Sequence, residues 1–514
     1  MGFPEQKTTR QLVVRVLSHN YGLISFLLPL LVYAGSLKVN VADTHVLNVL
    51  TQYAVWTTGS PSLGAVSHPI IPNWGSFYNV TSFDTIVSNG KFYSVYAPGM
   101  SYLSLPFGIL GFLLDKGILT TGTLAILADE GFVALCGALS GLVLYKACRL
   151  YAGPAASLLA SLTLSFGTIV WPFATELFDH DVAMLFSLLG VYCVLAFSRM
   201  EKAGSRRYLA LAAAGASLGI ASTVEYLSAL LFFPLILFLA FRRKLDLLSG
   251  VVLGAVFSLG PILDLFYNLT VTGNLLVFPE DIYGGTAFPS FDLSQLFTVS
   301  FYNLLSPYRG LFLFSPVLIL GVFGLYKMCQ TAKFRGDALL FLSLFLLGLL
   351  PYSAWGNWLG GYSFGPRFLV DVIPYLVIPI AFVLSENAKS KARRVVFLSL
   401  FALSSFIAGS GALTSSNPPV ESSLLQFPPL LQSIPWLLEN RLDVWWHHLQ
   451  PTLAPVAVAL CFVLIWGVAV SLSSALNVGT TGSSADVKLG MFSHGYASPE
   501  ADDNPVDDIF FVGQ

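Results

Sequence analysis

The sequence predicts an all-α, multi-pass membrane protein with about twelve transmembrane helices. Of its 514 residues, 55% are hydrophobic and only 11% are charged, and the mean hydropathy is +0.73. A soluble domain carries roughly a quarter charged residues, so this chain lacks the polar surface that a soluble protein needs. The apolar residues also come in blocks of about 17–25, the length of a helix that crosses the hydrocarbon core. The net charge of −2 argues against nucleic acid as a partner.

The positions of the apolar blocks give the topology. One further stretch, 97–115, contains Pro98 and Pro106 and either crosses the membrane or lies along its surface. If it lies along the surface, about twenty of the 26 lysines and arginines fall on the cytoplasmic side, as the positive-inside rule requires. The predicted spans are 19–37, 127–146, 154–171, 181–198, 207–223, 225–241, 248–267, 311–328, 337–353, 368–385, 394–412 and 452–473.

This topology divides the chain into four parts and places both termini in the cytoplasm. Long loops on one side of a rigid helical scaffold are where binding and chemistry usually occur, and here they fall on the extracytoplasmic side of a cell membrane. The outer loops are 38–120, with surface-lying helices, then 268–310 and 354–367. The parts are a cytoplasmic N-terminus (1–18), a membrane module (19–412), an outer loop with the last span (413–473) and a disordered cytoplasmic tail (474–514).

Five strings, in this order, carry a resemblance to a known family over about 20–385. They are DTIVSNGKFYSVYAPG (84–99), TELFDHD (175–181), STVEY (222–226), SPYRGLFLFSP (306–316) and GYSFGPRFL (361–369). With the layout of spans and loops, they resemble the GT-C superfamily of integral-membrane glycosyltransferases, in particular its protein-mannosyltransferase-like branch. Many relatives carry an Asp-Lys pair where this chain has Val95-Tyr96, so any role of that lysine in binding the donor phosphate falls elsewhere.

Asp43, just after the first span, is the candidate catalytic base. In the GT-C pattern an acidic residue at the start of the first outer loop has this role, so the resemblance implies it here. Glycosyl transfer from a lipid phosphate needs a carboxylate to take the proton of the acceptor hydroxyl. The leaving group is already an anion and needs no acid, unlike that of a glycoside hydrolase. The alternative is that Asp43 caps the helix that begins near Thr44.

Further acidic residues are candidates for substrate binding, each with a structural alternative. Asp84 positions the acceptor or assists a metal, or it forms a turn before Asn89. Asp179 and His180 face the acceptor or the sugar, or Asp179 caps a helix. A charged carboxylate is costly in lipid, so Glu225 is expected to face an interior cavity. The alternative is that it caps the start of a helix.

Arg309 and Arg367 are the candidate phosphate ligands. Both lie outside, directly before a span, in strings rich in aromatic residues and glycine. A guanidinium presents a planar fork that suits phosphate oxygens. The alternatives are an arginine that anchors the helix at the interface, or an ion pair with a nearby acid such as Asp371.

The predicted function is that of an inverting glycosyltransferase. It moves a sugar from a polyprenyl-phosphate donor to a hydroxyl acceptor (a glycan, a lipid or a protein) on the extracytoplasmic side, among membrane lipids. No cofactor is certain from the sequence, and a divalent cation stays open through the Asp-His-Asp triplet at 179–181. The alternatives are a transporter or flippase of lipid-linked saccharides, or a non-catalytic protein of the same fold; no internal repeat of the kind found in transporters is visible.

Overall fold

The computed structural model confirms an all-α membrane fold. It describes residues 20–38, 43–63, 84–118, 123–200, 205–283, 291–360, 363–386, 390–414, 429–447 and 450–476. The predicted termini, 1–18 and most of 474–514, lie outside these ranges. Within them, seven helices are long and apolar enough to cross a membrane. They are α7 (Thr123–Cys148), α10 (His180–Arg199), α11 (Ser205–Val224), α13 (Leu247–Thr272), α18 (Arg335–Ala354), α20 (Lys391–Leu413) and α22 (Ala454–Ala475).

Several predicted spans are shorter or interrupted helices. The block 225–241 is a 3-10 turn, η2 (Tyr226–Leu231), that continues into α12 (Phe232–Phe241). Hydropathy measures apolar content and does not distinguish a 3-10 helix from an α-helix. The other short apolar helices are α2 (Tyr21–Gly35), α8 (Pro154–Phe166), α9 (Val170–Phe173), α15 (Leu296–Leu305), α16 (Leu311–Phe314), η3 (Pro316–Leu318), α17 (Ile319–Gln330), η4 (Arg367–Val372) and α19 (Pro374–Glu386).

Helix α10 lies at the centre of the bundle, and α13 and α22 lie at its edge. The apolar stretch of α10 is 89% buried, whereas those of α13 and α22 are only 22% buried. A helix that is apolar all round and still exposed needs an apolar solvent, which is the hydrocarbon of the bilayer. Helix α13 packs closely on α11 because Gly260 lies against the backbone of Gly219, where a side chain would overlap it.

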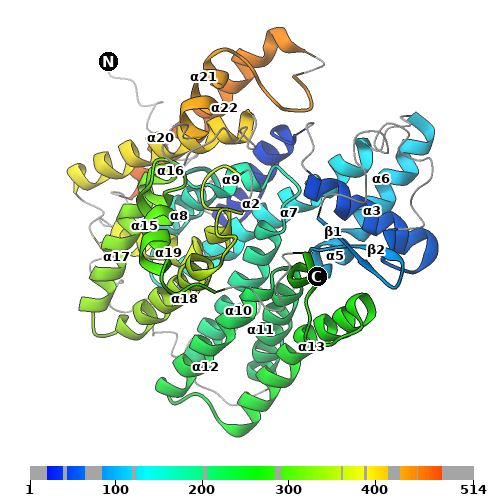
Figure 1. Ribbon diagram of the computed structural model, residues 1–514. Coiled ribbons are helices and arrows are strands. Elements are labelled where there is room, and N and C mark those ends of the chain that lie inside the picture. Colours follow the sequence, from blue (N-terminus) through cyan, green and yellow to red (C-terminus); the bar gives the residue numbers. More distant parts are fainter. Residues whose placement is uncertain are drawn as a thin grey trace, which may run out of the picture.

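The first long loop, which the sequence predicts to lie outside, folds into a small unit beside the bundle, on the right in Figure 1. It contains α3 (Asp43–Thr58), strands β1 (Thr85–Ser88) and β2 (Lys91–Ser94), α5 (Pro98–Leu103) and α6 (Leu105–Ile118). The antiparallel hairpin turns at Asn89 and Gly90, both with positive φ (50° and 73°), as a tight hairpin turn requires. Asn48 ties α3 to the bundle, because its amide donates to Asp129 of α7 at 3.0 Å.

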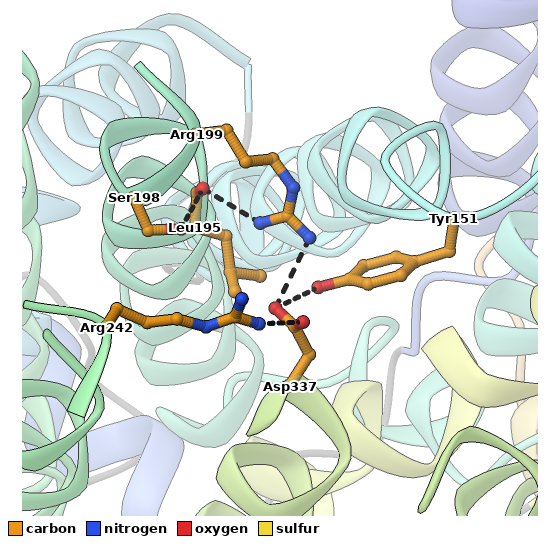
Figure 2. A network of polar contacts seen from close by, with 6 residues as sticks. All are labelled: Tyr151, Leu195, Ser198, Arg199, Arg242 and Asp337. Atoms are coloured by element: carbon orange, nitrogen blue, oxygen red, sulfur yellow. Dashed lines mark hydrogen bonds and ion pairs between the residues drawn. The ribbon is translucent and has the colours of Figure 1, made fainter. Parts of the chain in front are cut away.

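A buried carboxylate joins three helices at the far end of α10 (Figure 2). Asp337, in the first turn of α18, is 1% exposed. It accepts hydrogen bonds from Arg242 at the end of α12 (2.5 Å), from Arg199 at the end of α10 (3.3 Å) and from Tyr151 (3.1 Å). We call this end of the bundle the basic end. It lies about 30 Å from the start of α10, given a rise of 1.5 Å per residue over its 20 residues.

Candidate functional site

Three carboxylates surround one imidazole where α10 and η2 begin and η4 lies. The Nδ1 atom of His180 lies 3.6 Å from Asp371 and 3.8 Å from Glu225, and its Nε2 atom lies 3.7 Å from Asp179. The His180 side chain is 2% exposed. We call these four residues the acidic site. It lies at the end of α10 opposite the basic end.

Two of these carboxylates lie at helix starts, but neither of them caps its helix. Asp179 occupies the N-cap position of α10, and Glu225 occupies that of η2. Neither side chain makes a capping hydrogen bond. The sequence left helix capping as the alternative role for both residues, and the geometry does not support it. Both side chains face His180 instead.

Part of the acidic site has the ligand set of a metal centre. Asp179, His180 and Glu225 each offer one ligand atom, and these atoms lie within 4.8 Å of one another. A mixture of carboxylate and imidazole suits first-row transition metals. Nδ1 of His180 makes no hydrogen bond within the described part of the chain. Asp181, the second acid of the Asp-His-Asp triplet, is fully buried and is not part of this group.

Arg367, the first residue of η4, lies beside the acidic site. Its guanidinium carbon is 4.8 Å from the ring centre of Phe368 and 5.5 Å from that of Phe178. His180 packs on the same two rings, at 5.6 Å from Phe368 and 6.4 Å from Phe178. Two shared phenylalanine rings therefore connect the guanidinium with the imidazole.

Arg309 supports the segment that leads into Arg367. Its side chain is 2% exposed, and its guanidinium donates to the hydroxyl of Ser363 at 2.7 Å and to the carbonyl of Gly365 at 3.2 Å. Gly365 has φ +84°, a conformation that favours glycine. Burial lowers the pKa of Arg309 to about 10, with a smaller contribution from the charge of Arg367. Arg309 therefore stays protonated at neutral pH and holds this turn.

The β1–β2 hairpin brings Asp84 and Tyr96 to the same region. Asp84 has φ +48° at the base of the hairpin, and its carboxylate accepts a hydrogen bond of 2.5 Å from the hydroxyl of Tyr96. Burial and the charge of Asp84 raise the pKa of Tyr96, while the charge of Arg367 lowers it. The phenol therefore stays protonated, and its electrostatic coupling with Arg367 indicates that the hairpin lies near the acidic site.

The structure brings most of the predicted site residues together. Asp179, His180 and Glu225 meet directly, with Arg367, Arg309 and Asp84 nearby. Asp43 is the first residue of α3, but its side chain lies outside the described residues.

Two members of the site had no assigned role in the sequence. From the sequence, Asp371 is expected only as an ion-pair partner of Arg309 or Arg367, whereas in the structure it faces His180 and Ser228. Tyr96 was noted only as a departure from the family. Its position, where many relatives carry a lysine, is the signal that could have identified it.

The comparisons with known proteins agree with this fold. Residues 130–264, which include Asp179, His180 and Glu225, match the family model of dolichyl-phosphate-mannose-protein mannosyltransferase. The structure is similar to ArnT from Cupriavidus metallidurans in the apo state, at 16% identity, with 93% of this chain and 79% of that chain covered and a TM-score of 0.50. No curated protein matches the chain.

Two further solved structures are more distant. ArnT from the same organism bound to undecaprenyl phosphate has 15% identity, covers 92% of this chain and 79% of that one, and has a TM-score of 0.47. The archaeal oligosaccharyltransferase AglB from Archaeoglobus fulgidus, in complex with an inhibitory peptide and a dolichol-phosphate, has 13% identity, covers 95% and 61%, and has a TM-score of 0.46. The family match over 130–264 and the shared fold with ArnT confirm the resemblance that the motifs indicated: the chain has the fold of the GT-C superfamily of membrane glycosyltransferases.

Proposed function

We propose that the protein is an inverting glycosyltransferase that takes a sugar from a polyprenyl-phosphate carrier and passes it to a hydroxyl acceptor. The observation that carries the proposal is the contact of Arg367 and His180 with the same two rings, which brings a guanidinium next to three carboxylates. A lipid-phosphate donor needs a cation, and an acceptor hydroxyl needs a base. The matched family, described as using dolichyl-phosphate-mannose, supports this class of donor.

Arg367 is the proposed phosphate ligand. Its Nε atom is buried and makes no hydrogen bond within the described residues, so this donor is kept for a ligand. Its guanidinium carbon lies over the rings of Phe178 and Phe368, and a planar guanidinium held there can donate its N–H groups to a phosphate oxygen. In an apolar setting such a contact stabilises the charge of the leaving phosphate far more than it would in water.

The proposed reaction forms one bond and breaks one. The acceptor oxygen attacks the anomeric carbon from the side opposite the phosphate, and the bond from that carbon to the phosphate oxygen breaks with its electron pair. The lipid phosphate leaves as an anion, so no acid is needed. We assign the acceptor proton to Asp43, as the family pattern implies, and the positioning of the acceptor to Asp84, which Tyr96 orients.

A divalent cation is a further proposal for Asp179, His180 and Glu225, which would hold it through one atom each. Bound there, it would supply positive charge to the phosphate that leaves. A cation bound there would favour the charged forms of the three acidic side chains around the imidazole. Asp371, which faces Nδ1 of His180, would then help to orient the imidazole.

We place the reaction on the extracytoplasmic side. The acidic site and the basic end lie at opposite ends of α10, and arginines such as Arg199 and Arg242 gather at the basic end. The positive-inside rule puts that end in the cytoplasm, which supports an outward-facing acidic site. A site at this boundary lets the polyprenyl chain stay in hydrocarbon while its sugar reaches water.

The test uses the full chain in liposomes with labelled polyprenyl-phosphate mannose and a mixture of hydroxyl acceptors. Transfer of label and release of polyprenyl phosphate are measured for the wild type and for Arg367→Gln and Asp43→Asn. Each substitution is expected to lower kcat/KM by about 100-fold or more. Arg441→Gln, an exposed arginine paired with Glu439, is the matched control. Unchanged transfer in Asp43→Asn removes the assigned base, and movement of intact donor across the bilayer without transfer indicates a flippase.

A further inference from the structure

An apolar groove opens between three helices at the basic end, away from the acidic site. Helix α19 forms its floor through Ile380 and Val383, and Leu320 and Phe323 of α17 form one wall. The first turns of α20 form the other wall. The groove encloses about 260 Å³. It exists because α17 packs directly on α19, where Gly324 contacts the backbone of Pro379 and leaves no room for a side chain.

The surface on both sides of the groove is apolar and exposed. On α17, Ile319 is 52% exposed, and on α20, Val395 is 62% exposed. Exposed branched side chains along a membrane-spanning helix face acyl chains. The groove therefore opens sideways into the hydrocarbon, and the material that can enter it from there is an acyl chain.

Basic side chains from α17 and α20 lie in or near the groove. Arg393 lines it in the first turn of α20 and is exposed. Lys327, near the end of α17, lies 5.7 Å from the ring centre of Phe323, which itself lines the groove. Arg394 also lines it and donates to the carbonyl of Ser473 at 3.3 Å, which ties α20 to α22. Glu386, the last residue of α19, is the acid nearest to Arg393 and Arg394 in the chain.

We propose that this groove binds an anionic membrane phospholipid from the leaflet at the basic end. One acyl chain would fill the groove, and the headgroup phosphate would lie between Lys327 and Arg393. The excess of positive charge favours a lipid with net negative charge over a zwitterionic one, whose own ammonium group would meet these cations. The site is separate from the acidic site, so the proposal does not depend on the proposed function.

The test measures lipids that stay bound to the full chain. The protein is placed in nanodiscs with equal amounts of phosphatidylglycerol and phosphatidylcholine, and native mass spectrometry counts the lipids retained after release. The wild type is expected to keep one phosphatidylglycerol per chain. Arg393→Gln and Lys327→Gln should each lower its retention about fivefold, the effect of one charge near the membrane surface. Ala392→Phe, which fills the groove without a change of charge, should remove it.

Lys391→Gln is the matched control, since it removes the same charge from the same helix turn at a residue that does not line the groove. Equal retention of the two lipids by the wild type overturns the proposal. So does an equal loss in Lys391→Gln and Arg393→Gln, which would mean that only the overall charge of this end matters. A mass of two chains without bound lipid also overturns it, because a second copy would then cover the groove.

Discussion

Asp371 lies behind His180, with its Oδ1 atom 3.6 Å from the Nδ1 atom of the imidazole. Its other carboxylate oxygen accepts a hydrogen bond from the hydroxyl of Ser228, at 3.3 Å. The carboxylate is thus held by η2 and directed at a histidine of α10. At this distance the charge of the carboxylate acts on the imidazole through space and favours one orientation of the ring. The same short helix, η4, begins with Arg367, so one segment positions both the carboxylate that faces the imidazole and the guanidinium.

We expect Asp371→Asn to lower kcat by about 10- to 100-fold, the usual cost of losing an orienting partner. The amide keeps the size of the side chain but carries no charge to hold the imidazole. Binding of polyprenyl phosphate should stay within about twofold, because Arg367 is unchanged, and conversion of the aspartate to glutamate should rescue part of the rate. The measurement is kcat and KM for the donor. Asp292→Asn, at an exposed loop carboxylate, is the control. Equal losses in kcat and in donor binding would contradict a positioning role.

Arg309→Lys should weaken donor binding without removing the reaction. Lysine keeps the positive charge but cannot reproduce the fork that contacts both Ser363 and Gly365. One lost hydrogen bond to a charged group corresponds to about 1.5–3 kcal/mol of stability. We expect a lower melting temperature in detergent and a rise in KM of about tenfold, because the turn before Arg367 loosens. If KM stays constant while stability falls, Arg309 supports the fold and not the phosphate site.

A chelator should reduce the activity if the acidic site holds a divalent cation. We expect EDTA to lower transfer, Mn²⁺ to restore it, and Glu225→Gln to weaken cation binding by 10-fold or more, since a neutral amide is a poorer ligand. Calorimetry with Mn²⁺ alone measures the binding separately from activity. Asp181→Asn is the matched control, because Asp181 is buried nearby but does not belong to the ligand group. Full activity in EDTA, with no Mn²⁺ bound by the wild type, would rule out the cation.

Tyr96→Phe should lower kcat/KM for the acceptor by about tenfold or more. The substitution removes the hydroxyl that donates to Asp84 at 2.5 Å and leaves the ring in place. A hydrogen bond to a charged group contributes about 1.5–3 kcal/mol, which corresponds to at least a tenfold change. The acceptor dependence of transfer is measured at saturating donor. Tyr93→Phe, in the same hairpin, is the control. A loss that appears only in donor KM would assign Tyr96 to the phosphate instead.

The parts of the site that the sequence predicted are those in which a charge interrupts an apolar pattern. Asp179, Glu225 and Arg367 stand at such interruptions, where a helix begins and backbone geometry changes. Asp371 was harder to recognise, because it lies inside a block counted as a span. Its partner His180 is 191 positions away, and nothing local indicates that pairing.

The fold, like the site, could be predicted only in part from the sequence. Apolar content predicted the helical membrane fold, but it did not detect that the block 225–241 begins as the 3-10 helix η2 before it continues into α12. The β1–β2 hairpin was missed, although Asn89-Gly90 is a strong signal for a hairpin turn. That dipeptide was interpreted only as the turn that follows Asp84. The strands on either side have four residues each, too short for a clear alternating pattern.

The network in Figure 2 gives a prediction on stability that is independent of the reaction. Asp337→Asn removes the charge that pairs with Arg199 and Arg242 and joins α10, α12 and α18. Breaking a buried ion pair costs about 3–5 kcal/mol, and we expect the low end, because the two arginines are 32% and 37% exposed.

Thermal unfolding in detergent measures this loss of stability. Transfer at low temperature should stay near that of the wild type, because the acidic site lies at the other end of α10. Glu439→Gln is the matched control, since Glu439 and Arg441 form an exposed pair at 3.9 Å that should contribute less than about 1 kcal/mol. If Asp337→Asn melts with the wild type, the two arginines are solvated well enough without the carboxylate, and the three helices are held together by apolar packing alone.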